Sequence, residues 1–284
     1  MRIIAKPLAG LANKLRVIES SVSLAKELQC PVEIIWVPDQ QMVAHYRELF
    51  EPSDLFDVIE YDKYRYCRSS FTMKGYKKPL SRFINSCYGI DMGFNEADIK
   101  DYVRPGKWDI HLLAKGKKIY VDTCHDFFSF HYKFSWVQPI PPIADAISLF
   151  SDVMGHNRCV GLHIRRTDNI SSIEQSPDYL FEEMIRKEIE QDGNVIFFLA
   201  TDDPGVENHF IGLFGADRIL VYFKRFGRNS VKAIQDAVTD WFLLSKCRKL
   251  YCSYFSSFSE TAAVFSGTEI HILNKDMIAD GLSE

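Results

Sequence analysis

Hydrophobic residues along the chain fall into short strand-like runs separated by segments with helical spacing. The first run occupies residues 3–5, and a loop holding Gly10 separates it from a segment whose apolar residues recur three and four positions apart. This spacing places them on one face of a helix. The next apolar run, at residues 32–37, is typical of a buried strand. Strand, helix and strand in this order predict a βαβ unit.

The pattern weakens after Tyr61, where aromatic residues are interspersed with basic ones and no period persists. We expect irregular structure or short helices there, and we regard this stretch as a candidate for contact with an acceptor molecule. The pattern returns at residues 117–122, which predict a further strand.

The second half of the chain alternates regularly between strands and helices. Predicted strands occupy residues 159–164, 195–200, 219–221, 249–252 and 269–273. Predicted helices lie around residues 143–153, 178–190, 204–213, 230–245 and 257–265. Such alternation indicates a parallel sheet with helices on both faces, as in a Rossmann-like α/β domain.

A proline-rich segment separates the two halves. Residues 138–142, Gln-Pro-Ile-Pro-Pro, can continue neither a helix nor a central strand. A length of 284 residues fits two domains or one large α/β unit. We therefore predict two domains, 1–141 and 142–284.

The composition is that of an ordinary globular protein. Hydrophobic residues make up 46% and charged residues 25% of the chain, which excludes disordered, collagen-like and coiled-coil proteins. With 38 acidic and 34 basic residues, the formal net charge is -4. Because nucleic-acid binding relies on a basic excess, we expect no nucleic-acid partner.

The seven cysteines are scattered, and no C-x-x-C pair occurs. Reduced thiols in a cytosolic chain are the simplest interpretation. The first residues fit no secretory signal, and every apolar run is far shorter than the ~20 residues that span a bilayer. We expect a cytoplasmic protein with no transmembrane segment, which could still associate peripherally with the inner face of the membrane.

Polar residues follow three of the predicted strands in the second half. Arg165 to Asp168 follow the first strand, Thr201 to Asp203 follow the second, and the serine-rich residues 253–260 follow the fourth. Ligands of open parallel sheets bind beyond the carboxyl ends of the strands. These three strand exits are therefore the candidate site.

The arginine pair at the first exit has two interpretations. Arg165 and Arg166 can grip a phosphate with rigid, permanently charged groups. They can also form ion pairs with Asp168 or Asp202 at the surface. His163 belongs to the same exit, and its presence favours the ligand interpretation.

The other two exits are also open to a structural interpretation. Ser257 and Glu260 fit a capping box, yet a helix start also suits a phosphate oxygen, which Ser256 or Ser257 would contact. Residues 201–203 can cap the following helix or bind ribose hydroxyls or a base edge.

Asp236 and Asp240 are four residues apart and therefore share one face of a predicted helix. Their apolar neighbours indicate that this helix is partly buried, so that each carboxylate needs a partner. The N–H groups of a guanine are one candidate partner, and a salt bridge to Arg165 or Arg166 is the other.

Several familiar motifs are missing. No dinucleotide fingerprint, P-loop, nucleophile elbow, zincin motif or Asp-x-Asp sequence occurs. His125 and His131 are six residues apart, a spacing that fits no common metal site. We expect no metal and no cofactor.

Residues 161–169, GLHIRRTDN, resemble the first peptide motif of the alpha-1,6-fucosyltransferases and of the GT-B fucosyltransferase superfamily, which includes alpha-1,2- and protein O-fucosyltransferases. Residues 198–204 resemble the second block of that group and residues 240–260 its third, in the same order and at similar spacing. Near the N-terminus, AGLANKLR resembles the group's Gly-Leu-Gly-Asn loop, which makes Gly10 and Asn13 candidate site residues, with Ala12 in place of the second glycine.

The resemblance implies a GT-B fold, in which two Rossmann-like domains with parallel sheets face a cleft. Residues 1–141 would form the acceptor side and residues 142–284 the donor domain. The implied activity is that of an inverting, metal-independent glycosyltransferase, which moves fucose from GDP-fucose to a glycan or glycolipid acceptor in polysaccharide biosynthesis.

The resemblance also implies roles for single residues. Arg165 would contact the β-phosphate of the donor, and Arg166 would help to hold the charge of the site. The remaining donor contacts would be His163 and Asp240 to guanine, Asp202 and Asp203 along the nucleotide, and Ser253, Ser256 or Ser257 at the diphosphate.

The general base is where the chain departs from the resemblance. The alpha-1,6 enzymes carry lysine at the position of Asn169, and the acid downstream falls at Glu174 after a different spacing. Glu174 is our candidate base for the acceptor hydroxyl, and Asp168 is the second candidate.

Other functions remain open at this point. The same scaffold could use another nucleotide-sugar donor, since the lysine is absent. A non-catalytic protein that binds a nucleotide sugar or a glycan would keep the Arg–Ser pocket but no base, and a sugar-nucleotide epimerase would need no acceptor.

Overall fold

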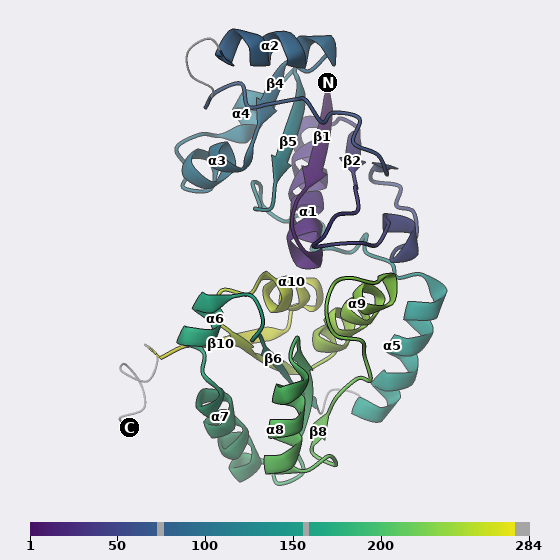
Figure 1. Cartoon of the computed structure of the whole chain (residues 1–284), viewed down its shortest axis with the longest axis vertical. Helices are drawn as coiled ribbons and strands as arrows, with labels where there is room; N and C mark the ends of the chain where they lie inside the picture. Colours follow the sequence, from purple (N-terminus) through teal and green to yellow (C-terminus); the bar gives the residue numbers. More distant parts are fainter. Residues whose placement is uncertain (73–76, 156–158, 276–284) are drawn as a thin grey trace. The chain divides into compact units, whose positions relative to one another are not determined.

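The computed structural model describes residues 1–72, 77–155 and 159–275. The chain divides into two compact units, Met1–Gln138 and Pro139–Glu284 (Figure 1), and each unit is considered by itself below. The division falls just before the expected boundary, because the prolines at 141 and 142 open helix α5 (Pro141–Met154) and are not part of a linker. Proline suits the first turn of a helix, where its missing N–H would be unpaired in any case.

The first unit is built on a parallel sheet of order β3-β2-β1-β5-β4. Helix α1 (Leu11–Leu28) packs against β1 and connects it to β2, which confirms the predicted βαβ unit. The strands of this sheet are β1 (Arg2–Pro7), β2 (Val32–Ile35), β3 (Asp57–Ile59), β4 (Met92–Phe94) and β5 (Lys118–Thr123).

The stretch after Tyr61 contains short helices, as expected. They are α2 (Lys77–Cys87), α3 (Glu96–Asp98), the π-helical turn η2 (Ile99–Val103) and α4 (Ile110–Ala114), and the 3-10 turn η1 (Tyr46–Glu48) precedes them. Strands β3 and β4 were not predicted, because three residues are too few to display a strand period.

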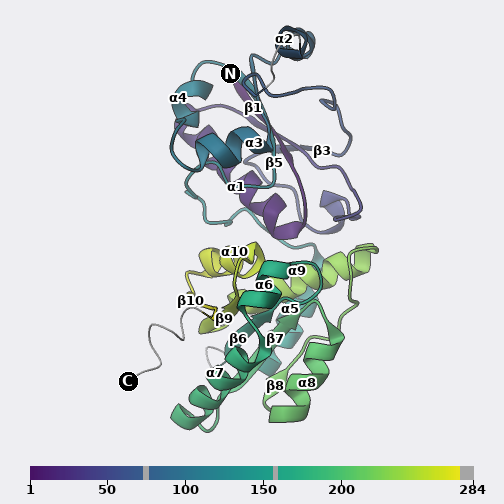
Figure 2. The same cartoon turned by 60° about the vertical axis from the view of Figure 1, so that its left-hand side comes forward.

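The second unit contains a second parallel sheet, of order β10-β9-β6-β7-β8. Its strands are β6 (Cys159–Ile164), β7 (Ile196–Thr201), β8 (Ile219–Leu220), β9 (Lys249–Ser253) and β10 (Glu269–Leu273), close to the predicted positions. Helices α7 (Asp178–Gln191), α8 (Pro204–Phe214), α9 (Val231–Ser245) and α10 (Ser257–Ser266) also lie as predicted, whereas α6 (Ile170–Gln175) was missed (Figure 2).

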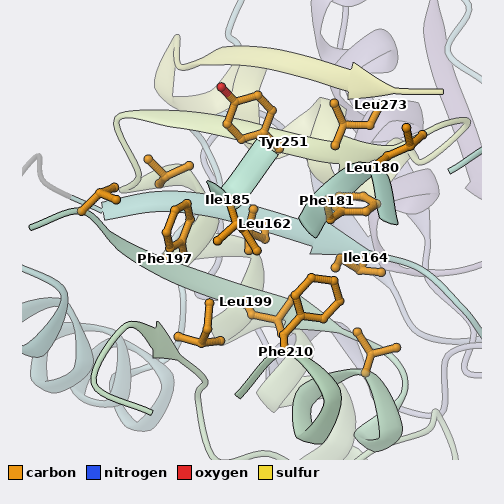
Figure 3. Packing of buried hydrophobic residues seen from close by; sticks show 14 residues of the cluster. Leu162, Ile164, Leu180, Phe181, Ile185, Phe197, Leu199, Phe210, Tyr251 and Leu273 are labelled. Atoms are coloured by element: carbon orange, nitrogen blue, oxygen red, sulfur yellow. The ribbon is translucent and has the colours of Figure 1, made fainter. Parts of the chain in front are cut away.

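Strands β6 and β7 are the centre of this second sheet. Their apolar runs supply Leu162, Ile164, Phe197 and Leu199, all inaccessible to solvent, and helix α7 covers them with Phe181 (Figure 3). Continuous apolar runs of this kind are typical of strands that are buried on both faces.

The order of the strands reverses beside β6. The chain builds outward from β6 through β7 to β8, and then returns to place β9 and β10 on the other side of β6. The carboxyl ends of β6 and β9 therefore flank a topological switch point, where the connections leave in opposite directions and a crevice is available for ligands.

Candidate functional site

The loop after β6 is held by the two neighbouring strand exits. Ser253 Oγ, at the end of β9, accepts a hydrogen bond from the Arg165 N–H at 3.1 Å. Asp202, which follows β7, accepts from the Arg166 N–H at 2.7 Å and from Thr167 Oγ1 at 2.7 Å. The three exits identified in the sequence thus meet at one edge of the sheet, with the arginine loop fixed between the other two.

Asp202 acts on the backbone of this loop. Its burial opposes ionisation, but the hydrogen bonds from Thr167 and Arg166, together with the charge of Arg165, lower its pKa below the usual range. Asp202 is therefore an anchoring carboxylate of the arginine loop. Asp203 caps α8, because its side chain accepts from the Gly205 N–H at 2.7 Å, in line with the capping interpretation.

The Arg165 side chain is paired with Asp168. Its Nε and Nη2 donate to Asp168 Oδ1 at 3.0 and 2.5 Å. The other oxygen, Oδ2, lies 3.0 Å from Nη2 of Arg228, a residue that the sequence analysis did not single out. Two guanidinium groups thus share one half-exposed carboxylate, and the group of three residues keeps a positive charge that can attract a phosphate.

Arg166 has a different neighbourhood. Its guanidinium forms an ion pair with Asp178 at the start of α7, and it donates to the Ser176 carbonyl at 2.7 Å. Its side chain is only 9% exposed. Of the ion pairs considered in the sequence, Arg165 with Asp168 occurs, whereas the partner of the Arg166 side chain is Asp178 and not Asp168 or Asp202.

His163 lies in the interior, at the end of β6. Its Nδ1 is 3.1 Å from Ser259 Oγ and 3.4 Å from Ser256 Oγ, and its ring stacks on Phe258. Burial and, to a smaller extent, the charge of Arg165 lower the pKa of His163 to about 3. The imidazole is therefore neutral at neutral pH and acts as a hydrogen-bonding group without charge.

Helix α10 begins one residue earlier than a capping box at Ser257 requires. Ser256 occupies the N-cap position and makes no side-chain capping bond, while Ser257 is already helical. The predicted capping box from Ser257 to Glu260 was therefore wrong in register. The N-terminal turn of α10 follows β9 directly, so that its backbone N–H groups lie at the switch-point edge.

The acids on α9 hold a basic loop. Asp240 Oδ2 accepts from Lys224 Nζ at 2.8 Å, and Asp236 Oδ2 accepts from the Arg225 N–H at 2.9 Å. The shared helix face was predicted, but the partner of Asp240 is Lys224 and not Arg165 or Arg166. The partner was missed because the basic residues Lys224, Arg225 and Arg228 lie in an irregular connection.

Lys224 and Asp240 form a buried ion pair to which Glu207 also belongs. Lys224 Nζ is 3.0 Å from Glu207 Oε1, and burial of the ammonium is outweighed by the two carboxylates, which raise its pKa above the usual range. Burial raises the pKa of Asp240 to about 6, although Lys224 opposes this shift. Among the described residues, Asp240 Oδ1 is a buried oxygen without a hydrogen-bond donor.

Glu174 lies on α6 and is exposed. Asn169 caps this helix through the Ser172 N–H at 3.2 Å and also donates to the Phe255 carbonyl at 2.9 Å. Ser172 Oγ donates to the Tyr254 carbonyl, so that α6 is tied to the exit of β9. The structure thus attaches the helix of the candidate base to the edge where the arginine loop lies.

Gly10 and Asn13 belong to the first unit, at the exit of β1. Gly10 is the N-cap residue of α1, without a side chain to cap it, and Asn13 is half-buried in the first turn.

One cluster in the described chain offers three possible metal ligands. Glu96, Cys124 and His125, in the first unit, bring one ligand atom each within 4.8 Å of one another. Burial, followed by the effect of Glu96, raises the pKa of the Cys124 thiol to about 11, and the guanidinium of Arg16 lies 3.3 Å from His125 Nδ1. A protonated thiol and a neighbouring cation both oppose metal binding, so that hydrogen bonding explains this cluster better.

No protein-family model matches the chain, and no curated protein matches it. No described helix has the length and apolar content that crossing a bilayer requires.

Solved structures of fucosyltransferases share the fold. NodZ alpha-1,6-fucosyltransferase soaked with GDP-fucose matches with a TM-score of 0.61 and 17% identity, over 93% of this chain and 92% of that chain. A variant of Arabidopsis thaliana FUT1 in complex with GDP matches with a TM-score of 0.62 and 11% identity, over 95% and 69%. POFUT1 in complex with GDP-fucose matches with a TM-score of 0.53 and 10% identity, over 96% and 98%. The chain therefore has the two-sheet GT-B fold of the fucosyltransferases whose peptide motifs it resembles.

Proposed function

We propose that this protein is an inverting glycosyltransferase that transfers fucose from GDP-fucose to a glycan or glycolipid acceptor without a metal ion. The observation that carries the proposal is the arginine loop at the switch point, clamped by Ser253 and Asp202 beside the start of α10. The similarity in fold to enzymes solved with GDP-fucose or GDP supports the choice of donor.

The diphosphate is the leaving group, and its charge has to be stabilised as the bond to the sugar breaks. Arg165 and Arg228 would supply the positive charge, and the backbone N–H groups at the start of α10 would bind phosphate oxygens. Ser256 and Ser257 flank that helix start. These groups would perform the task that a bound cation performs in metal-dependent transferases.

The nucleoside would lie toward α9. Asp240 Oδ1, a buried acceptor that no described residue satisfies, suits the N–H groups of guanine. His163, neutral and buried, would supply a hydrogen bond from the end of β6, and Asp202 and Asp203 would line the same side.

The transfer itself breaks the bond between the anomeric carbon and the β-phosphate oxygen, and the acceptor oxygen bonds to that carbon from the opposite face. A base takes the acceptor proton. We assign this role to Glu174, because Asp168 is already bound by two arginines.

The acceptor assignment and the cellular compartment are part of the proposal. Surface-polysaccharide biosynthesis in the cytoplasm fits a chain whose seven cysteines are all free, including the neighbouring buried pair Cys159 and Cys247.

Isothermal titration with GDP, UDP, ADP and their sugars, with and without EDTA, tests the donor site. We expect selective binding of GDP that EDTA does not weaken, and a loss of about 1.5–3 kcal/mol in Arg165→Ala because a charged hydrogen-bond donor is removed. Asp168 keeps Arg228 as a partner in this variant. Arg186→Ala is the matched control and should bind GDP normally. In the unmodified protein the Arg186 guanidinium, on α7, lies over the ring of Phe214, at the end of α8.

Preference for UDP or ADP would mean that the donor is another nucleotide sugar and not GDP-fucose, while the protein would still be a glycosyltransferase. Absence of nucleotide binding would mean that the three strand exits have a structural role only, and the proposed function would then be wrong.

Glu174→Gln separates a transferase from a non-catalytic binding protein. Removal of the base should lower kcat by about 10²–10⁴-fold and leave GDP affinity unchanged. Glu183→Gln, an exposed glutamate on α7, controls for the loss of one charge. Full turnover in Glu174→Gln would transfer the role of base to Asp168.

A further inference from the structure

Helix α2 of the first unit carries its apolar side chains on the outside. Ser81 and Asn85, one turn apart, are 3% and 1% exposed, whereas Leu80 and Phe83 are 52% and 67% exposed. A helix on the surface of a globular protein normally does the reverse, with apolar residues toward the core. Figure 1 shows α2 at the periphery of its unit.

Hydrogen bonds hold α2 in this orientation. Ser81 Oγ donates to the Ser69 carbonyl at 2.8 Å, and the Asn85 side chain exchanges two hydrogen bonds with the backbone of Arg68, at 3.0 and 2.9 Å. Rolling the helix to bury Leu80 and Phe83 would break all three bonds and leave buried polar groups unpaired. The outward apolar face is therefore built into the fold.

The outward residues form a stripe with helical spacing. Leu80, Phe83 and Cys87 follow one another at three and four positions, and Ile84 borders them half-buried. Arg82 and Lys77, also on α2, are exposed.

The surroundings of the stripe are positively charged. Between residues 63 and 90 the sequence contains no aspartate and no glutamate, although the whole chain has a net charge of -4. On the segment leading to α2, Tyr66 is 50% exposed with the guanidinium of Arg65 4.8 Å from its ring centre. Within residues 63–90, exposed leucine, phenylalanine and tyrosine thus occur together with basic residues and without acidic ones.

We propose that α2 docks the protein on a bilayer that contains anionic phospholipids. Leu80 and Phe83 enter the interfacial region, while Lys77, Arg82 and Arg65 face the lipid phosphates. An amphipathic helix that joins an apolar stripe to basic residues binds such surfaces by burial and charge together.

Other binding partners would match only some of the features of the α2 surface. An acidic glycan or a nucleic acid would engage the cations and leave Leu80 and Phe83 in water. A second copy of the chain would cover the stripe, but the uniform positive charge of the segment would oppose a face-to-face contact.

Helix α5 gives an internal comparison. Leu149 and Val153, one turn apart, are 73% and 60% exposed, but α5 contains no lysine or arginine and carries Asp145 and Asp152. Helix α5 therefore has exposed apolar residues but no basic residues, and it is not expected to bind anionic lipid.

Co-sedimentation of the full chain with vesicles tests the inference, without any substrate. We expect binding to vesicles of phosphatidylcholine with phosphatidylglycerol, weaker binding at high salt, and little binding to phosphatidylcholine alone. Leu80→Ser with Phe83→Ser should lower the partition coefficient at least about tenfold, because two apolar side chains no longer enter the bilayer. The matched control, Leu149→Ser with Val153→Ser, should bind as the unmodified protein does.

A second variant separates charge from burial. Lys77→Gln with Arg82→Gln should lower binding to the anionic vesicles several-fold and leave the residual binding to phosphatidylcholine unchanged. Both α2 variants alter exposed residues, and their thermal unfolding should match that of the unmodified protein.

The inference is overturned if the protein binds neither kind of vesicle, if it binds both equally, or if the α5 variant loses as much binding as the α2 variant. Concentration-dependent dimers in analytical ultracentrifugation that Leu80→Ser with Phe83→Ser abolishes would identify a second copy as the occupant instead. Because no donor or acceptor is present, failure here leaves the proposed transferase activity untouched.

Discussion

Asp240 is a buried acid whose two oxygens have different surroundings. Oδ2 accepts from Lys224, whereas Oδ1 is buried without a donor among the described residues. Burial disfavours the ionised form of this carboxyl group and raises the pKa of Asp240 to about 6, although Lys224 opposes the shift. The residue is therefore poised to gain or lose its charge just below neutral pH.

If Asp240 reads guanine, GDP binding should depend on pH. Below pH 6 the protonated acid loses its charge as an acceptor, so that the Kd for GDP should rise as the pH falls from about 7 to about 5. Asp240→Asn should bind more weakly and show little of this dependence, because the amide does not titrate. Titration calorimetry at several pH values measures both.

Two neighbours serve as controls for this pH dependence. His163 keeps its neutral form across the range, since its pKa is lowered to about 3. Asp236→Asn changes the other acid of the same helix face and should keep the dependence of the unmodified protein. An Asp240→Asn profile that coincides with that of the unmodified protein would remove Asp240 from the nucleotide site.

At the scale of elements, α1 fixes a loop through one carboxylate. Glu19 is fully buried, and its Oε1 accepts from the N–H groups of Tyr132 and Lys133 at 2.8 and 3.0 Å. Its Oε2 accepts from the Phe134 N–H at 3.0 Å and from Trp136 Nε1 at 2.7 Å. Lys133 and Phe134 have positive φ, a conformation that side chains seldom adopt without such support.

Glu19→Gln should therefore destabilise the protein by about 3 kcal/mol or more. The NH2 group of the glutamine would face N–H donors that now bind one oxygen of Glu19. At least two of these donors would lose their acceptor, and each loss costs about 1–3 kcal/mol. Urea unfolding measures the change. Glu27→Gln, on the same helix but half-exposed beside His131, should be nearly neutral, and equal stabilities for the two variants would contradict the anchoring role.

Long helices and strands could be predicted from the sequence, and short ones could not. The helix pattern from Leu15 to Leu28 and the buried runs of β6 and β7 extend over enough residues to display their spacing. Strand β4 and helix α6 are too short for that. In α2 the helical spacing is present, but from spacing alone Leu80 and Phe83 would be expected on the buried face. The hydrogen bonds of Ser81 and Asn85, which the spacing does not reveal, fix the opposite rotation of the helix.

At the scale of the whole molecule, the predicted topology of the second sheet was enough to identify the sheet edge at which the candidate site lies. Parallel strands with polar exits share one edge, so that Arg165, Asp202 and Ser253 could be placed together without coordinates. The pair of Arg165 with Asp168, three residues apart, could also be predicted, but ion pairs between distant segments could not. Asp178 pairs with Arg166, Arg228 with Asp168, and Lys224 with Asp240, and each choice depends on loop geometry that no local pattern encodes.

The Asp168 carboxylate between Arg165 and Arg228 has a consequence for how a diphosphate would enter. Asp168 is an anion that belongs to the chain itself, so that binding of a diphosphate would exchange one partner of the two arginines for another. Such an exchange displaces few ions from solution, and affinity should decline gently with ionic strength. It also sets a threshold, because an anion with less charge than a diphosphate competes poorly with a resident carboxylate.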